Sequence, residues 1–221
     1  MSKQKHRRQT VWVGGDFHFD HWPINFHCNR GFDNVDDMND ALVHNWNSRV
    51  NKGDLMIVVG DLAWKRHRKW CNVLNGSKIL VRGNHDKMPL LSLEQFSEVH
   101  DTLCRRYSGT SCYFHHYAQR VWPGMYGRVT GSGVVIPPAV HLYAHSHGTL
   151  EDWTHTHSID VGVDVWGLAP IRLDAVVSMV QERTLNSPVI DDSETKREVM
   201  RKKRLVLSER NLKFLKRWRN Q

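Results

Sequence analysis

The most restrictive feature of this 221-residue chain is that five short polar clusters each stand directly behind an apolar run. The runs are typical of buried strands; they are Val11–Val13, Leu55–Val59, Lys78–Val81, Cys112–Phe114 and Val140–Tyr143. The clusters behind them are Asp16-Phe17-His18, Gly60-Asp61, Gly83-Asn84-His85-Asp86, His115-His116 and His145-Ser146-His147. Open α/β sheets place their active sites at the carboxyl ends of strands. The pattern therefore predicts an α/β protein whose carboxylates, amide and imidazoles gather at one edge.

These side chains form a mixed oxygen and nitrogen donor set, which suits borderline divalent metals. Three of the clusters, taken alone, also have an ordinary structural explanation. Asp16-x-His18 arises often by chance, Gly60-Asp61 is a common strand-to-turn sequence, and Asn84 can cap a helix. The five clusters together, each behind a strand, favour a metal site over these alternatives and indicate a two-metal hydrolase.

Length and charge indicate one main domain followed by a basic extension. We expect the domain over residues 1–185 and a linker with a basic helix over residues 186–221. The net charge is +8, yet Lys196–Arg219 alone holds eleven Lys and Arg against two Glu. The rest of the chain is therefore nearly neutral. Four cysteines without paired spacing predict reduced thiols, and neither a signal peptide nor a membrane-length apolar run is visible. The expected location is the cytoplasm, without membrane contact.

A coarse walk along the chain supports alternating helices and strands. A helix is expected over Val35–Val50, where Met38, Leu42 and Trp46 recur near helical spacing. The other expected elements are a loop at Phe19–Phe32, a basic amphipathic segment at Lys65–Leu74, a short helix at Ser92–Glu98, a hairpin of Val99–Leu103 with Ser111–Phe114, a loop at Trp122–Pro138, late strands at Ser158–Val161 and Pro170–Leu173, and a helix to Arg183.

The series Asp-x-His, Gly-Asp, Gly-Asn-His-Asp, His and His-x-His resembles the calcineurin-like metallophosphoesterase superfamily, over about Val11–Trp166. Within it, the stretches Cys28-Asn29-Arg30 and Asp160–Asp164 resemble the small stand-alone members of bacteria and their phages. The resemblance implies a four-layer α/β/β/α sandwich of two sheets, in the cytoplasm of a bacterium or of a phage-infected host cell. It also implies two divalent metal ions, with Mn preferred and Fe, Zn, Ni or Co as alternatives.

Carried over by position, the resemblance implies a ligand set for each metal. The first metal would take Asp16, His18, Asp61 and His147, and the second would take Asp61, Asn84, His116 and His145. The chain departs from the family pattern at Ala144, where a Gly is usual, and at Tyr117-Ala118, where Tyr-Pro is usual. Because neighbouring residues on a strand face opposite ways, only one of His115 and His116 reaches the metals, and we expect His116.

The mechanism implied is attack on phosphorus by a hydroxide that bridges the two metals. His85 is the candidate general acid for the leaving oxygen, and Asp86 either orients that imidazole or caps a helix. The motif Gly60-Asp61-Leu62-Ala63-Trp64 lacks the Asp-Arg-Gly continuation of protein phosphatases. A phosphodiesterase acting on nucleotides or nucleic acid is therefore favoured over a monoesterase, with a phosphoprotein phosphatase as an alternative. Asn25, Arg30 and Arg120 are candidate substrate contacts, or else loop residues in solvent.

The basic tail offers a second hypothesis. Lys196–Arg219, with Phe214 and Trp218, has the composition of a segment that binds phosphate backbones. The alternative is a terminal helix that docks an apolar stripe on the domain and leaves its charges in water. A non-catalytic nucleic-acid or protein-binding module on the same fold is a further possibility. It is disfavoured because such relatives have usually lost ligands that this chain retains.

Overall fold

The computed structural model describes residues 9–87, 93–150 and 156–185. The chain divides into two units, Met1–Asn186 and Ser187–Gln221. The second unit, with the basic segment Lys196–Arg219, lies outside the described residues, so the expected linker and tail helix stay predictions. Among the described residues, no helix is long and apolar enough to cross a membrane, and all four cysteines are free thiols.

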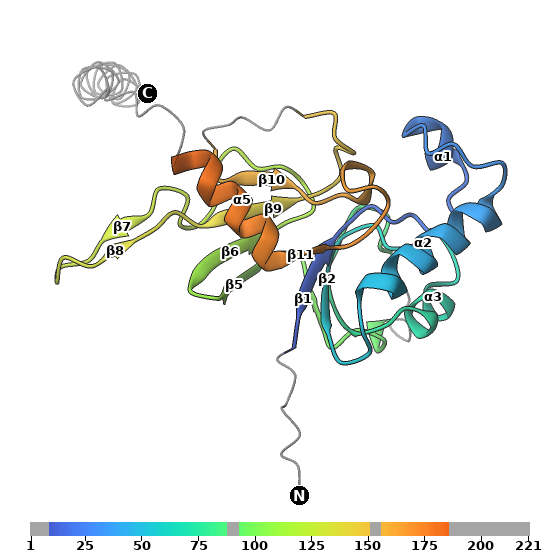
Figure 1. Cartoon of the computed structure of the whole chain (residues 1–221), viewed down its shortest axis with the longest axis horizontal. Coiled ribbons are helices and arrows are strands. Elements are labelled where there is room, and N and C mark those ends of the chain that lie inside the picture. Colours follow the sequence, from blue (N-terminus) through green and yellow to red (C-terminus); the bar gives the residue numbers. More distant parts are fainter. Residues whose placement is uncertain (1–8, 88–92, 151–155, 186–221) are drawn as a thin grey trace, which may run out of the picture. The chain divides into compact units, whose positions relative to one another are not determined.

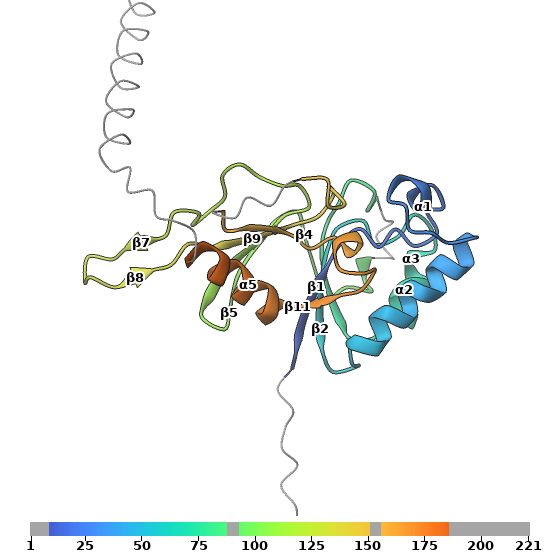
Figure 2. The same cartoon turned by 45° about the horizontal axis from the view of Figure 1, so that its top comes forward.

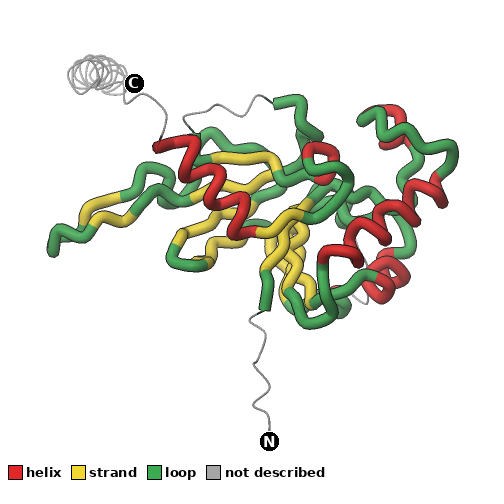
Figure 3. Tube along the Cα trace, in the orientation of Figure 1, coloured by secondary structure: helices red, strands yellow, loops and turns green. Residues whose placement is uncertain are grey.

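Two main sheets make up the described domain (Figure 1 and Figure 3). The first has the order β11-β1-β2-β3-β4 and the second has the order β10-β9-β6-β5, while β7 and β8 form a separate pair. The strands are β1 Val11–Gly14, β2 Leu55–Val59, β3 Ser77–Val81, β4 Glu98–His100, β5 Leu103–Tyr107, β6 Thr110–Phe114, β7 Arg128–Val129, β8 Val135–Ile136, β9 Val140–Tyr143, β10 Ser158–Asp160 and β11 Ile171–Arg172. The helices are α1 Pro23–His27, α2 Val35–Arg49, α3 His67–Val73, the 3-10 turn η1 Val163–Val165, and α5 Leu173–Leu185.

The first sheet is buried on both faces. Met56, Val58 and Leu80 point to one face and pack with Trp46 of α2 and Trp70 of α3. Residues of the opposite face pack with the inner face of the second sheet and with α5 in one continuous cluster that includes Val13, Ile57, Val81, Phe114, Leu142, Val176 and Val180. Helices α2 and α3 therefore lie on one side of the first sheet and the second sheet lies on its other side (Figure 2). The expected two-sheet α/β fold is confirmed.

Helix α2 illustrates how the sequence specifies these layers. Asn34 caps its amino end by accepting a hydrogen bond from the Asp37 N–H at 2.9 Å. Met38, Leu42 and Trp46, spaced four residues apart, are fully buried against the first sheet. The helix expected over Val35–Val50 is thus confirmed to within one residue.

Four local expectations need correction or lie partly outside the described residues. The Phe19–Phe32 loop contains α1, and the Trp122–Pro138 loop contains β7 and β8. The predicted strand Val99–Leu103 is divided: β4 pairs with β3 in the first sheet, whereas β5 forms the hairpin with β6. Ser108 and Gly109 join β5 to β6 with φ of 47° and 87°, as a two-residue turn requires. The predicted Ser92–Glu98 helix begins in the gap at 88–92, and Glu98 belongs to β4.

Strand direction explains why the polar clusters meet. β1, β2 and β3 run parallel in the first sheet, and β6 and β9 run parallel in the second. Their carboxyl ends therefore lie at one edge of each sheet. The two edges are joined because the Gly15 N–H donates to the Val161 carbonyl at 3.1 Å, and the Val163 N–H donates to the Gly15 carbonyl at 3.0 Å.

Candidate metal centre

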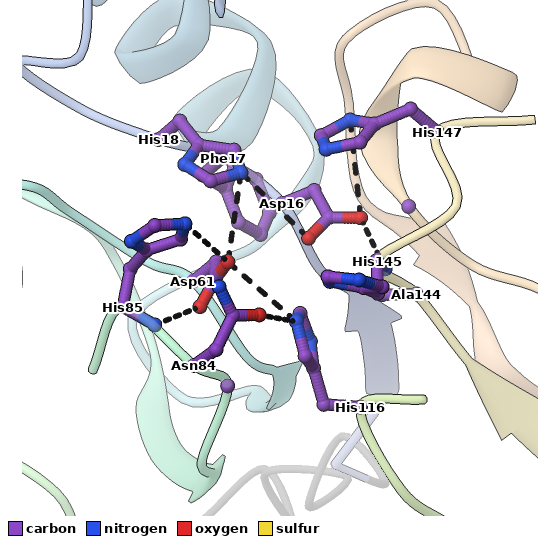
Figure 4. Close-up of polar contacts among 12 residues, drawn as sticks. Asp16, Phe17, His18, Asp61, Asn84, His85, His116, Ala144, His145 and His147 are labelled. Atoms are coloured by element: carbon purple, nitrogen blue, oxygen red, sulfur yellow. Dashed lines mark hydrogen bonds and ion pairs between the residues drawn. The ribbon is translucent and has the colours of Figure 1, made fainter. Parts of the chain in front are cut away.

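Seven side chains predicted as ligands converge where the two sheet edges meet (Figure 4). The residues are Asp16 and His18 behind β1, Asp61 behind β2, Asn84 behind β3, His116 behind β6, and His145 and His147 behind β9. Five of them, namely Asp16, His18, Asp61, His145 and His147, have positive φ between 47° and 68°. Left-handed backbone at non-glycine residues costs free energy and concentrates at functional sites. The loops therefore hold these side chains at the cost of backbone strain.

The glycines between the strands and the ligands permit this close approach. A Cβ on Gly60 would lie 2.2 Å from His116 Nδ1, and a Cβ on Gly83 would lie 2.2 Å from Asp61 Oδ1. Gly60 also has φ of 84°, which a residue with a side chain adopts only with strain. Any larger residue at either position would push the loops that carry Asp61 and Asn84 apart from the rest of the cluster.

The first group of donor atoms comprises Asp16, His18 and His147, whose ligand atoms lie within 4.8 Å of one another. His18 Nε2 is 3.8 Å from Asp16 Oδ1 and 3.7 Å from Asp61 Oδ2. His147 Nδ1 is 4.0 Å from Asp16 Oδ2. Asp61 thus stands beside this group, as a shared ligand would.

The second group comprises Asp61, His116 and His145, also within 4.8 Å. His116 Nε2 lies 3.5 Å from Asp61 Oδ2 and 3.0 Å from Asn84 Oδ1. His116 Nδ1 is 3.0 Å from the Val59 carbonyl oxygen, which can only accept, so neutral His116 carries its proton on Nδ1. The lone pair on Nε2 then faces two oxygen acceptors with no proton between them, an arrangement that a cation satisfies. His115 is directed elsewhere, because its Nδ1 accepts from the Tyr117 N–H at 3.1 Å.

Unpaired buried atoms support the same fit. Among the described residues, Asp16 Oδ1 and His18 Nε2 are buried without a hydrogen-bond partner. An unsatisfied buried polar atom costs about 1–3 kcal/mol, so two of them side by side need a physical explanation. A divalent ion between them supplies one, and the residues present therefore fit a metal centre.

Burial also sets the proton affinities of the metal-free cluster. It raises the pKa of Asp61 to about 6 and raises the pKa of Asp16 well above its usual range. It lowers the pKa values of His18, His116 and His145, which leaves these imidazoles neutral and able to bind a metal. His147 is the exception: burial opposes its charge, but contacts with Asp164, Cys28 and Asp16 outweigh burial and raise its pKa to about 10.

Two buried carboxylates outside the donor groups hold the ligand loops. Asp86 Oδ2 accepts from the N–H groups of Asp61 at 2.7 Å and Gly83 at 2.8 Å, and its Oδ1 accepts from Leu62 N–H at 3.1 Å. Asp160 Oδ2 accepts from Ser146 Oγ and from Gly148 N–H, both at 3.0 Å. Both oxygens of Asp86 are therefore occupied by backbone. Asp86 was expected among the catalytic residues, either to orient the His85 imidazole or to cap a helix; instead, its carboxylate positions the second and third motif loops.

Arg30 is a buried structural residue, which corrects its predicted role as a substrate contact. Its guanidinium pairs with both oxygens of Asp164, at 2.8 and 2.9 Å. It also donates to the carbonyls of Asp16 at 2.7 Å and Phe17 at 2.9 Å. Asp164 in turn lies 2.6 Å from His147 Nδ1. The Cys28-Asn29-Arg30 and Asp160–Asp164 stretches therefore meet in space behind the first donor group.

Of the other two candidate substrate contacts, Asn25 is engaged within its own loop, whereas the expectation for Arg120 stays a prediction. Asn25 is buried, and its amide exchanges two hydrogen bonds with the Phe32 backbone, at 3.0 and 2.9 Å. These bonds close the loop and turn the amide away from solvent. Arg120 is exposed and makes no contact with the donor groups within the described part of the chain. The sequence reasoning missed the roles of Asp160 and Asp164, although it singled out the stretch that contains them.

Comparison with known proteins identifies relatives of the chain. The family model for calcineurin-like phosphoesterases matches residues 9–168. An uncharacterized protein of Methanocaldococcus jannaschii is 30% identical over 192 residues, which cover 80% of this chain and 97% of the relative. A crystal structure of a protein of unknown function from Aquifex aeolicus superposes with a TM-score of 0.59 at 20% identity, over 78% of this chain and 100% of that one. The Aquifex structure is thus similar in fold.

Proposed function

This chain belongs to the calcineurin-like phosphoesterase family, and from that premise we propose that it is a dinuclear-metal-dependent phosphoesterase. The observation that carries the proposal is the pair of donor groups, one with Asp16, His18 and His147 and the other with His116 and His145, on either side of Asp61. Two divalent ions held there would supply Lewis acidity toward the phosphoryl oxygens and activate a water molecule for in-line attack. The mixed donor set suits Mn, our preference, as well as Fe, Zn, Ni or Co.

The leaving oxygen needs a proton, and His85 is the residue we assign to deliver it. Its side chain is 34% exposed, and its Nε2 lies 3.9 Å from Asp61 Oδ2. Its backbone N–H donates to Asp61 Oδ1 at 2.9 Å, which fixes the residue beside the centre without using the imidazole. The ring thus borders the donor groups and is also open to solvent, as a general acid must be to reach a substrate.

The substrate class that we favour is a phosphodiester of a nucleotide or nucleic acid. A protein phosphatase of this family would carry an Arg for phosphate in the continuation of the Gly60-Asp61 motif. Here the third residue after Asp61 is Trp64, and the Arg66 that follows pairs with Asp20. The neighbourhood of Asp61 is therefore aromatic as well as basic, which suits a substrate with an aromatic part.

Metal analysis and two chromogenic esters test the proposal. We expect about two divalent ions per chain, and metal-dependent hydrolysis of bis-p-nitrophenyl phosphate that exceeds hydrolysis of p-nitrophenyl phosphate. His85→Asn should retain the metals and lose about 10²–10⁴-fold in kcat, the usual contribution of a general acid. His115→Asn is the matched control, because His115 is adjacent to the donor group but its Nδ1 accepts a hydrogen bond from the Tyr117 N–H. Full metal content with undiminished kcat in His85→Asn would refute the assignment.

A further inference from the structure

An exposed aromatic stack borders one side of the metal centre. The Trp64 and His21 rings are nearly parallel, with centroids 4.4 Å apart and an interplanar angle of 10°. The Trp64 ring also contacts His85, with centroids 4.9 Å apart at 52°. Trp64 nevertheless remains 44% exposed. His21 covers one face of the indole and His85 lies against the ring at an angle, so another flat ring would pack on the part of Trp64 that these two imidazoles leave exposed.

The backbone holds Trp64 in this place. Its N–H donates to the Phe19 carbonyl at 2.8 Å, and the preceding residue, Ala63, forms a parallel bridge with Phe19. Ala63 and Phe19 are both buried. The same short connection joins Trp64 to Asp61, so the indole is positioned with the loops that carry the donor groups. An exposed Trp on a rigid support loses little conformational freedom when a ligand binds.

We propose that Trp64 is the platform on which a nucleobase of the substrate stacks, on the side of the leaving group. This inference rests on the proposed function, because it is His85, the group assigned to protonate the leaving oxygen, that Trp64 contacts. A base carried by the leaving alcohol would lie beside that imidazole when the phosphate is at the metals. The ligand chemistry is thus a phosphate ester attached to an aromatic base.

The charge next to Trp64 agrees with such a ligand. Lys65 is exposed just before α3 and Arg68 is exposed in the first turn of that helix, and exposed cations beside an aromatic platform are the usual arrangement for phosphate-linked bases. Lys69 and Arg66 are engaged with the Trp70 ring. The open cations are therefore close along the chain to the open aromatic ring, where a second phosphate of a strand would pass.

Binding of two non-hydrolysable ligands tests the platform. We would titrate the metal-loaded protein by calorimetry with the phosphonate analogues of adenosine 5′-monophosphate and ribose 5-phosphate, in which a methylene group replaces the ester oxygen. Base–aromatic stacking is worth about 1–3 kcal/mol, so the analogue with the base should bind about 5- to 150-fold more tightly. Trp64→Ala should reduce this ratio to below twofold, and Trp64→Phe should retain most of it.

A second exposed aromatic residue supplies the control. Phe26 on α1 is 68% exposed and contacts the Trp22 ring, so Phe26→Ala should leave the ratio unchanged. A ratio near one in the unaltered protein, or a ratio that persists in Trp64→Ala, overturns the inference even if phosphate esters are hydrolysed. The opposite outcome is also informative. If the affinity ratio of the two analogues depends on Trp64 but the protein hydrolyses no ester, the platform is upheld and the proposed function is overturned.

A short oligonucleotide distinguishes the two sources of such a base. If the substrate is a nucleic acid, a phosphorothioate-linked deoxyadenosine tetramer should bind at least tenfold more tightly than the mononucleotide analogue and weaken steeply with salt. If the substrate is a free nucleotide, the tetramer should bind no more tightly. Both results support the platform provided that Trp64→Ala weakens the binding; tetramer binding that is indifferent to Trp64 contradicts it.

Discussion

Removing the carboxylate of Asp164 should destabilise the protein more than almost any other single isosteric change. The Arg30 side chain is 1% exposed and that of Asp164 is 7% exposed. Arg30 therefore has no access to water when its partner loses charge. Two of its donors go to Asp164, and the remaining partners, the Asp16 and Phe17 carbonyls and the Met38 sulfur, carry no formal charge. Asp164→Asn thus leaves an uncompensated buried cation.

The expected cost follows from that burial. Breaking a buried ion pair by removing one partner costs about 3–5 kcal/mol. For a chain of this length, 1 kcal/mol shifts Tm by about 2–4 °C, so Asp164→Asn should lower Tm by about 6–20 °C. Arg30→Met should cost a similar amount, because Asp164 keeps only His147 as a partner among the described residues and two backbone carbonyls lose their donor. The double variant should cost about 1–3 kcal/mol less than the sum, since its two sites share one contact.

Urea unfolding in the presence of a chelator measures these differences. The chelator removes any contribution of bound metal to stability, so the ion pair is tested alone. His147→Asn, which removes the imidazole beside Asp164 but leaves the Arg30 pair intact, is the matched control and should cost less. A loss below about 1 kcal/mol in Asp164→Asn, or strict additivity in the double variant, would refute the reasoning.

Two further predictions concern pH and the tail. Because burial raises the pKa of Asp61 to about 6, this carboxyl keeps a proton between about pH 4 and 6 in the folded metal-free protein that it has lost in the unfolded chain. The contribution of Asp61 to stability therefore falls as pH rises through that window, and a metal ion must displace its proton. Mn²⁺ at a fixed concentration, a hundred times its Kd at pH 7.5, should raise Tm by about 5–10 °C at pH 7.5 and by little at pH 5; an equal rise at both values would contradict this. Deleting residues 192–221, which include Lys196–Arg219, should weaken nucleic-acid binding and flatten its salt dependence; an unchanged salt slope in a filter-binding assay would rule the tail out.

The fold and the make-up of the cluster were accessible to sequence reasoning for a local reason. Each polar cluster directly follows its apolar strand in the sequence. The apolar run therefore identifies the strand, and the end of the run identifies the strand's carboxyl end, where the cluster lies. The two-residue period of a strand also predicts that only one of His115 and His116 faces the metals, and the structure directs His116, the expected residue, toward Asp61.

The site residues whose roles were predicted wrongly have long-range partners, which local sequence patterns do not reveal. Arg30 and Asn25 were assigned to substrate because polar residues in a loop near a ligand motif are expected to face solvent. Arg30 instead finds Asp164, 134 residues away, and no local pattern reports a partner at that separation. Both carboxylate oxygens of Asp86 likewise accept hydrogen bonds from backbone N–H groups of another loop. The positioning role of Asp86 is visible only when the two loops are packed together.

By itself, the sequence determined which strands precede the donor residues and in what order the two follow one another along the chain. It could do so because side-chain periodicity and the residues that end a strand are local properties. Only the tertiary structure decided which polar residues face the centre and which support it from behind. That choice depends on pairing between sheets, on left-handed backbone at Asp16 and Asp61, and on buried partners such as Arg30 and Asp164. These are contacts over long sequence separations, formed when the second sheet closes against the first.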